Sequence, residues 1–402
     1  MEQVSKLETF SLDRRRFVQA GVAAAGLTCW SGGGWAGVQE WRTLTVGVLY
    51  PQSQRYPALG AEWLAGMQAW AAQHNGEVAL RLVPVQYGSR PSQARTALLE
   101  LLQARELDVA AAFVCRNAAA QWEPDLAQHE LPLLVCDAGA NAVQPEAFSP
   151  WVARHALGCW QANWAAGQWA ARHLGRRAIV AAGALESGFD MLPAFTQGFA
   201  AAGGSMPQVQ FTHLPDGRSQ LPELQHLVLE QRPDLVYALD SGQGAASLAA
   251  WWPQSGLEGR VPLVVGSTLA NSRARVPAGA WRVSAWDARL PGEANARFRA
   301  ALAGVQPSAL HLLGYETAQR LAAARADAGA GGSALASALA VPGLETPRGM
   351  VEGLPNGDIQ APAYIAGGAH DAAPTPLGTV ALAACTRVCG ALASRVTDTY
   401  LV

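Results

Sequence analysis

The chain has 402 residues, with 29 Lys and Arg against 31 Asp and Glu, so its formal net charge is −2. This near balance argues against nucleic acid or an anionic membrane surface as a partner. Half of the residues are hydrophobic and 15% are charged, which is typical of a globular chain long enough for two sizeable cores rather than of a disordered one.

Residues 1–36 are expected to be an export signal rather than part of the fold. Residues 13–17 (DRRRF) precede a nearly uncharged, Ala/Gly-rich run over 18–27, and consecutive arginines before such a run resemble a twin-arginine signal. Two alternatives remain, a frayed N-terminal helix and a lipid anchor on Cys29, although the residues before Cys29 match a lipobox poorly. The run is too short and Gly-rich for a good membrane span, and no later run is long enough. The mature chain is therefore predicted to be soluble and periplasmic.

The fold is predicted to begin with a strand, a polar loop and a helix. Residues 44–50 (LTVGVLY) form an apolar run that suits a strand covered on both faces. Residues 51–57 carry two prolines and polar side chains, which indicates a loop. In an open α/β sheet, ligands bind at the loops that leave the carboxyl ends of the strands. We therefore expect residues 51–59, with Ser53 and Tyr56, to line one wall of a small-molecule site.

The alternation of strands and helices continues along the chain. Further strands are predicted at 78–85, 107–114, 131–135, 178–182, 208–214, 235–239 and 261–265, and helices at 91–105, 118–129, 160–174, 191–203, 220–231 and 248–252. The later elements are a strand at 281–286, helices at 292–302, 310–328 and 333–341, and strands at 349–357 and 362–365. Two successive sets of strand–helix units predict an α/β protein with two parallel-sheet lobes.

Several local motifs follow one another in an order that carries a family resemblance. They are VGVL at 46–49, LG at 59–60, AG at 65–66, SQA at 92–94, PLL at 132–134, residues 195–203 after Ser187 and Gly188, PDLVY at 233–237, GYE at 314–316 and TPRG at 346–349. Together they resemble the type I periplasmic solute-binding proteins, in particular the branched-chain amino-acid-binding (Leu/Ile/Val) branch that serves ABC importers.

The resemblance implies two Rossmann-like parallel-sheet lobes that close on a small-molecule ligand in the cleft between them. By this resemblance, lobe one is 43–155 with 281–330, and lobe two is 156–280 with 331–367. It implies a membrane permease and an ATPase as partners, and neither a cofactor nor enzyme activity. The alternative is a ligand-sensing or accessory subunit of the same fold without a transport role. Consistently, the sequence has no Gly-x-Ser-x-Gly elbow, HExxH motif or CxxC pair.

The resemblance places ligand contacts of the first lobe at the ends of the third and fourth strands. Arg116 is able to bind a carboxylate in a bidentate manner, with a surface arginine as the alternative. Asn117 is a second ligand candidate, with the helix N-cap as its alternative. Asp137 could meet a cation, although Asp is also common in turns. Gly139 belongs to the small polar loop that follows Asp137.

In the second lobe, Ser187 stands where the family commonly has an aromatic residue, and Phe189 could supply the missing ring. Asp240 and Ser241 leave a strand whose loop faces the cleft in the family. Ser267 and Thr268 lie near the position of the acid that pairs with a ligand ammonium group, and neither is acidic. The sequence therefore favours an amide, a small carboxylate or another polar metabolite over a simple α-amino acid.

Three features outside these loops complete the analysis. Trp286 and Asp287, at the end of a returning strand, are candidates for a hinge or the cleft, and residues 314–316 are expected to serve helix packing. Residues 368–402 are expected to form a C-terminal extension, with a linker at 372–376 and a helix at 380–396. Cys385 and Cys389 would share one face of that helix, where packing is the commoner explanation and a redox or metal role the alternative.

Overall fold

The computed structural model describes residues 42–53, 56–74, 78–104, 106–142, 149–184, 186–214, 216–268, 276–328, 331–340, 343–378 and 380. The predicted export signal and the part of the C-terminal extension that holds Cys385 and Cys389 lie outside these residues. Within the described part of the chain, no helix combines the length and the apolar character that crossing a bilayer requires.

The first sheet contains five parallel strands in the order β2-β1-β3-β4-β5. They are β1 (Arg42–Pro51), β2 (Val78–Tyr87), β3 (Val109–Phe113), β4 (Leu133–Asp137) and β5 (Val152–Ala156). All residues of β3 are buried, as expected of a parallel strand that is covered on both faces. The first predicted parallel sheet is confirmed.

The second sheet has the order β15-β14-β10-β9-β8-β6-β7. Its strands are β6 (Ala178–Ala182), β7 (Gln208–Phe211), β8 (Leu235–Leu239), β9 (Leu263–Val265), β10 (Trp281–Ser284), β14 (Ala363–Gly367) and β15 (Ala372–Leu377). Strands β6 to β10 are parallel, and β14 and β15 extend the sheet with antiparallel pairs. A small antiparallel sheet contains β11 (Leu344–Thr346), β12 (Gly349–Gly353) and β13 (Ile359–Gln360). The predicted α/β class with two parallel-sheet lobes is confirmed.

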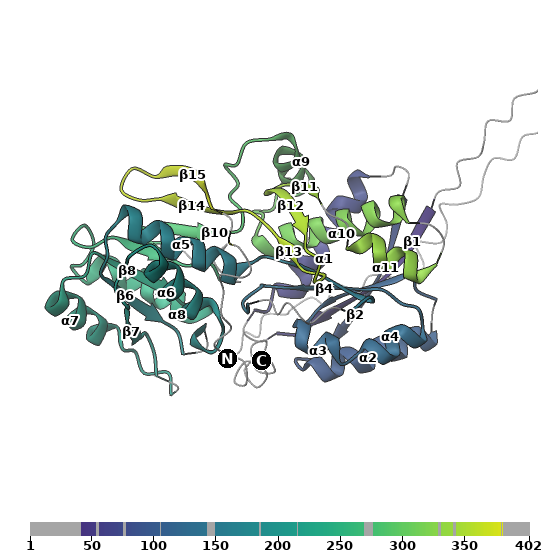
Figure 1. The fold of residues 1–402 in the computed structure, drawn as a ribbon, viewed down its shortest axis with the longest axis horizontal. Helices are drawn as coiled ribbons and strands as arrows, with labels where there is room; N and C mark the ends of the chain where they lie inside the picture. The colour runs from purple at the N-terminus through teal and green to yellow at the C-terminus, as the bar shows by residue number, and fades with distance from the viewer. Residues whose placement is uncertain are drawn as a thin grey trace, which may run out of the picture. The chain divides into compact units, whose positions relative to one another are not determined.

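The helices group around the two parallel sheets (Figure 1). Those near the first sheet are α1 (Leu59–Gln73), α2 (Pro91–Ala104), α3 (Arg116–Ala120), α4 (Glu123–Gln128), α9 (Glu293–Ala301), α10 (Ala309–Asp327) and α11 (Gly332–Leu339). Those near the second sheet are α5 (Cys159–His173), α6 (Met191–Ala201), α7 (Leu221–Gln231) and α8 (Gly242–Trp251), with short 3₁₀ turns at η1 (Glu186–Gly188) and η2 (Trp252–Gln254).

In each lobe, two helices cross at glycines. A Cβ added to Gly314 of α10 would overlap the carbonyl oxygen of Trp63 in α1, and one added to Gly66 would overlap that of His311. The second lobe repeats the arrangement between α5 and α6, where Gly198 lies against the backbone of Trp164. Glycine is needed here because the two backbones touch. The expected packing role of residues 314–316 is confirmed at Gly314.

The chain passes between the two sheets three times within the described residues: after β5, after β10, and between β13 and β14. The predicted lobe boundaries are wrong at two of these places. Strand β10, expected in lobe one, pairs with β9 of the second sheet. Helix α11, expected in lobe two, packs on α10 and near β5. A short apolar run does not reveal which sheet it joins, because both interiors are equally apolar.

Three local predictions also need correction. Strand β5 was not expected, because Arg154 and His155 interrupt its apolar character. Residues 372–376 are not a linker but part of the edge strand β15, a position that tolerates prolines. The helix expected at 118–129 is two helices, α3 and α4, with Pro124 in the first turn of the second.

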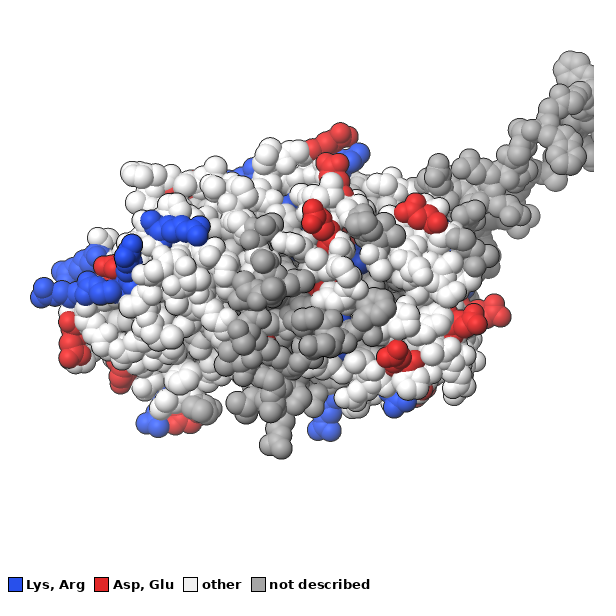
Figure 2. Space-filling model, in the orientation of Figure 1, with Lys and Arg blue, Asp and Glu red and all other residues white. Residues whose placement is uncertain are grey.

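Charged side chains cover a small part of the face shown in Figure 2. Figure 2 shows that, among the described residues on this face, Lys and Arg form no continuous stripe and most of the area is neither basic nor acidic. This agrees with the 15% of charged residues in the sequence. The face shown offers no electrostatic track for a polyanion.

Candidate functional site

A hydrogen-bonded cluster lies where β6 and β8 end, side by side in the second sheet. The hydroxyl of Ser241 donates to Oε1 of Glu186, and both side chains are fully buried. Asp240 accepts hydrogen bonds from the backbone N–H of Ser241 at 2.9 Å and from the hydroxyl of Thr212. The structure thus brings two predicted residues, Asp240 and Ser241, to the carboxyl edge of the sheet, where α/β proteins bind ligands.

Tyr56 of the first lobe reaches this cluster from the loop after β1. Its hydroxyl lies 2.8 Å from Oγ of Ser241, within a buried hydrogen bond. The backbone N–H of Tyr56 donates to Oγ of Ser53 at 2.9 Å, which holds the backbone of Tyr56 in place. Because Tyr56 follows a strand of the first sheet and Ser241 follows a strand of the second, this hydrogen bond joins the two lobes.

Two further hydrogen bonds join the lobes nearby. Oδ2 of Asp190, at the start of α6, accepts from the backbone N–H of Ala142 at 3.0 Å. The backbone N–H of Asp190 donates to Oδ1 of Asn141 at 3.3 Å. Ala142 and Asn141 follow β4 in the first lobe, so a loop of the first lobe is in contact with the loop that follows β6 in the second lobe. Contacts of this kind exist only when the lobes are close together.

The predicted contacts at Arg116 and Asp137 belong to a buried network of ion pairs. Arg154 contacts both carboxylate oxygens of Asp137, with the shortest distance 2.8 Å, and pairs with Asp358 at 2.7 Å. Arg116 donates to the carbonyl oxygen of Asn356 at 2.8 Å and lies 3.6 Å from Asp358. The charge of Asp137 is therefore already compensated inside the first lobe, which weakens the prediction that it meets a ligand cation.

Burial and the two aspartates act in opposite directions on the pKa of Arg154. Burial alone would lower this pKa, but Asp137 and Asp358 raise it above the ordinary value of arginine. For Arg116, burial lowers the pKa and Asp358 offsets only part of that effect. The network anchors β5 to the loop before β13, and a ligand role for Arg116 stays a prediction.

Four other predicted residues show no arrangement specific to a ligand contact. Asn117 is exposed and is not the N-cap of α3, since that position is Cys115. Gly139 has a positive φ of 64°, and a Cβ there would lie 2.7 Å from the backbone nitrogen of Gly158, so the position requires glycine. Ser187 donates to the carbonyl oxygen of Ala184 at 2.7 Å. Phe189 is buried in the core of its lobe.

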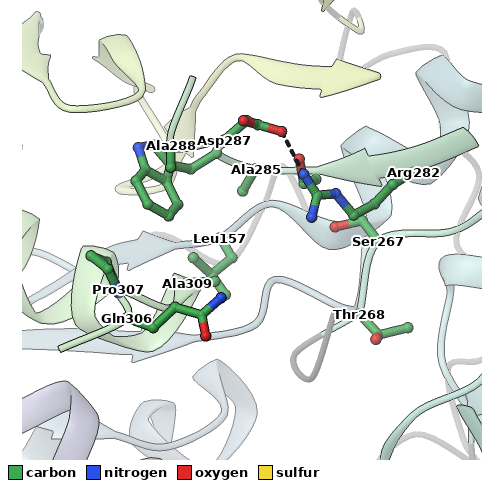
Figure 3. Close-up of a pocket in the computed structure, with 12 residues that line it drawn as sticks. Leu157, Ser267, Thr268, Arg282, Ala285, Asp287, Ala288, Gln306, Pro307 and Ala309 are labelled. Carbon is green, nitrogen blue, oxygen red and sulfur yellow. Dashed lines mark hydrogen bonds and ion pairs between the residues drawn. The ribbon is translucent and has the colours of Figure 1, made fainter. Parts of the chain in front are cut away.

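Ser267 and Thr268 lie in a cavity rather than at the cluster around Ser241. The side-chain amide of Asn163 holds the backbone of Ser267 by accepting from its N–H at 3.2 Å and donating to its carbonyl oxygen at 2.9 Å. Both residues line a cavity of about 150 Å³ together with Trp286 and Asp287, the predicted hinge or cleft candidates. Figure 3 shows Ser267 and Thr268 on one side of this space and Gln306, Pro307 and Ala309 on the other.

A buried cluster of Arg348, Glu316 and His155 holds the chain directly after β5, where it first leaves the first sheet. Arg348 pairs with Glu316 at 2.8 Å and donates to the carbonyl oxygens of Ala156 at 3.0 Å and Leu157 at 3.2 Å. His155 Nε2 lies 2.9 Å from Oε2 of Glu316. Burial lowers the pKa of His155 to about 4, although Glu316 acts in the opposite direction. The imidazole is therefore neutral at neutral pH.

Sequence reasoning missed two acids, Glu186 and Asp190, that the structure places where loops of the two lobes meet. Both lie in the loop after β6, where Ser187 and Phe189 were preferred because they aligned with a family aromatic. The general rule that polar residues at a strand end face the cleft would have included Glu186. Arg282, which lines the cavity, was missed because it lies inside a strand rather than after one.

Comparisons with known proteins agree with this geometry. The family model described as periplasmic binding protein matches residues 43–371. The chain belongs to the periplasmic binding protein family. A curated relative, a Leu/Ile/Val-binding protein homolog 6 from Brucella melitensis, is 24% identical over 218 residues, which are 53% of this chain and 55% of the relative. The chain thus spans about half the length of the curated relatives it matches.

Solved structures show the same fold. A solute-binding protein of an ABC transporter from R. palustris, in complex with benzoate, aligns with a TM-score of 0.66 and 22% identity over 86% of this chain and 97% of that one. An ABC transporter substrate-binding protein from Desulfitobacterium hafniense, in complex with Leu, aligns with a TM-score of 0.64 and 16% identity over 84% of this chain and all of the other. At these identities the comparison establishes the fold.

Proposed function

We propose that this periplasmic binding protein captures a small polar solute by closing its two lobes and delivers it to an ABC importer. The observation that carries the proposal is the buried hydrogen bond between Tyr56 and Ser241, which links loops of opposite lobes at the carboxyl edges of their sheets. A binding protein that traps its ligand needs such contacts in the closed state and must lose them on opening. The hydrogen bonds of Asp190 with Asn141 and Ala142 support the same reading.

The partners and the location follow from the same proposal. A permease and an ATPase would receive the solute from the closed lobes, and export through a twin-arginine signal within residues 1–36 would place the protein in the periplasm. The relatives hold an aromatic acid in one case and leucine in another, so they support a small organic solute without choosing its class. An amino acid, an amide and a small carboxylate all remain candidates at this level.

A thermal-shift screen of residues 37–402 against amino acids, amides and carboxylates tests the proposal. Ligand that binds only the folded state stabilises it by about 2.7 kcal/mol at one hundred times its Kd. We expect at least one class to raise the melting temperature in a saturable manner. A screen in which no small solute stabilises the protein would contradict the proposed function.

A further inference from the structure

The cavity at the crossovers is built by both lobes. Ser267, Thr268 and the residues around Arg282 contribute the second-lobe side, and Gln306, Pro307 and Ala309, just before and at the start of α10, contribute the first-lobe side. Leu157, on the first crossover, completes the lining. The cavity has a volume of about 150 Å³, which is large enough to hold one benzene ring. A change in the lobe arrangement changes the size of this cavity directly.

Two polar groups of β10 are buried next to this cavity without a partner. Nε of Arg282 and Oγ of Ser284 are both buried and make no hydrogen bond among the described residues. Arg282 and Ser284 are two residues apart on one strand, so their side chains point to the same face of the sheet. Buried donors of this kind cost free energy unless a ligand or water receives them.

The carboxylate of Asp287 is already fully used. Its oxygens accept hydrogen bonds from Arg282, from the guanidinium of Arg289 and from the backbone N–H of Arg289 at 2.9 Å. These four contacts fill the acceptor sites that a carboxylate offers. Burial would raise the pKa of Asp287, but Arg289 and Arg282 lower it below the ordinary value, so the group stays ionised. Asp287 therefore has no capacity left for a ligand ammonium group.

The balance of charge around the cavity favours an anion. Asp287 lies between two guanidinium groups, and Asp371, which also pairs with Arg289, is 85% exposed and screened by water. Among the described residues that line the cavity, Asp287 is the one acid. An incoming carboxylate would meet the open Nε of Arg282 and the hydroxyl of Ser284, while a zwitterion would leave its ammonium group unpaired in a confined space.

We propose that this cavity is the solute subsite and that it selects a monocarboxylate with one ring and no amino group. The carboxylate is bound by Arg282 and Ser284, and the ring lies against Leu157, Trp286 and Pro307. This inference rests on the proposed function, because it names the class of solute that the two lobes enclose. It decides between the amino acids, amides and carboxylates that remained open above.

Isothermal titration of the wild-type protein with benzoate, benzamide and leucine tests the inference. Benzamide has the shape of benzoate without its charge, and leucine carries the additional ammonium group. We expect benzoate to bind at least tenfold more tightly than the other two. Arg282→Gln and Ser284→Ala should each weaken benzoate binding, by about ten- to hundredfold for the arginine, because a hydrogen bond to a charged group is lost.

Arg218→Gln provides the matched control, since Arg218 is an exposed second-lobe arginine whose ion pair is with Asp216, far along the chain from the residues that line the cavity. It should leave benzoate binding unchanged, and thermal melts verify that each variant is folded. The assignment of the subsite would be overturned by leucine binding more tightly than benzoate, by no benzoate binding, or by an unchanged benzoate affinity in Arg282→Gln. If leucine binds and benzoate does not, the proposed function stands and only this inference fails. If no solute of any class binds, the proposed function fails as well.

Discussion

Replacement of Arg348 by Met tests whether the buried cluster at the first crossover maintains the fold. Arg348 is fully buried, and its guanidinium pairs with Glu316 through Nε at 3.1 Å and Nη2 at 2.8 Å. The same group donates to the carbonyl oxygens of Ala156 and Leu157, where the chain leaves the first sheet. Methionine keeps much of the volume but removes the charge, the three hydrogen bonds of the guanidinium and its ion-pair contact at Nη2.

The expected cost is large because Glu316 is also fully buried. The charge of Arg348 is a main reason that the pKa of Glu316 is lowered in spite of burial. Removing one partner of a buried ion pair typically costs about 3–5 kcal/mol, since the remaining charge has no compensation. Urea unfolding followed by circular dichroism should show a loss of this size for Arg348→Met, and Arg218→Met should show almost none.

The double variant Glu316→Gln/Arg348→Met separates this explanation from a general packing defect. With both charges removed, the double variant should be clearly more stable than the sum of the two single losses predicts, because neither buried charge is left alone. A loss below about 1 kcal/mol for Arg348→Met would refute the reasoning. Strict additivity of the two single variants would refute it as well.

Three further outcomes are expected from other residues. Tyr56→Phe removes the hydroxyl that contacts Ser241. It should raise the Kd of any solute that closes the lobes by about fivefold, because one hydrogen bond of about 1 kcal/mol is lost from the closed state. An unchanged Kd by titration would show that this contact does not contribute to closure. His155 has a pKa of about 4 in the folded protein against 6.5 in the unfolded chain, so between pH 6.5 and pH 4 only the unfolded chain takes up this proton. As the pH falls through this range, the free energy of unfolding should decrease by up to about 3 kcal/mol, and His155→Gln should abolish this decrease. A pH profile of stability shared by both proteins would contradict the assignment. Gly314→Ala places a methyl group against the carbonyl oxygen of Trp63 and should lower stability by about 1–3 kcal/mol in thermal melts; a melting temperature equal to that of the wild type would show that the two helices move apart freely.

The sequence predicted the interior of both sheets well. Strands β6 and β8 have the predicted bounds, because each is a short apolar run that ends at polar residues. A role in helix packing was likewise expected for residues 314–316, and Gly314 lies against the backbone of Trp63 in α1. Such elements depend on local periodicity and side-chain size, which a single sequence displays directly.

Long-range pairing was not visible in the sequence. Strand β5 was not predicted because it contains Arg154 and His155, which are tolerated in a buried strand only with polar partners. Arg154 pairs with Asp358, about two hundred residues further along the chain, and His155 with Glu316, about one hundred and sixty residues further along. For the same reason Arg116 and Asp137 were predicted as ligand contacts before their partners were known. The cavity residue Arg282 gave no local signal, since the first-lobe wall opposite it comes from a different part of the chain.

Small-angle X-ray scattering of residues 37–402, with and without a solute found to bind, tests the central claim that two lobes close on a small guest. The account predicts a smaller radius of gyration in the presence of saturating solute. Tyr56→Phe should need a higher solute concentration to reach the same decrease, because its Kd is expected to be higher. Binding of a solute with identical scattering curves before and after addition would contradict it.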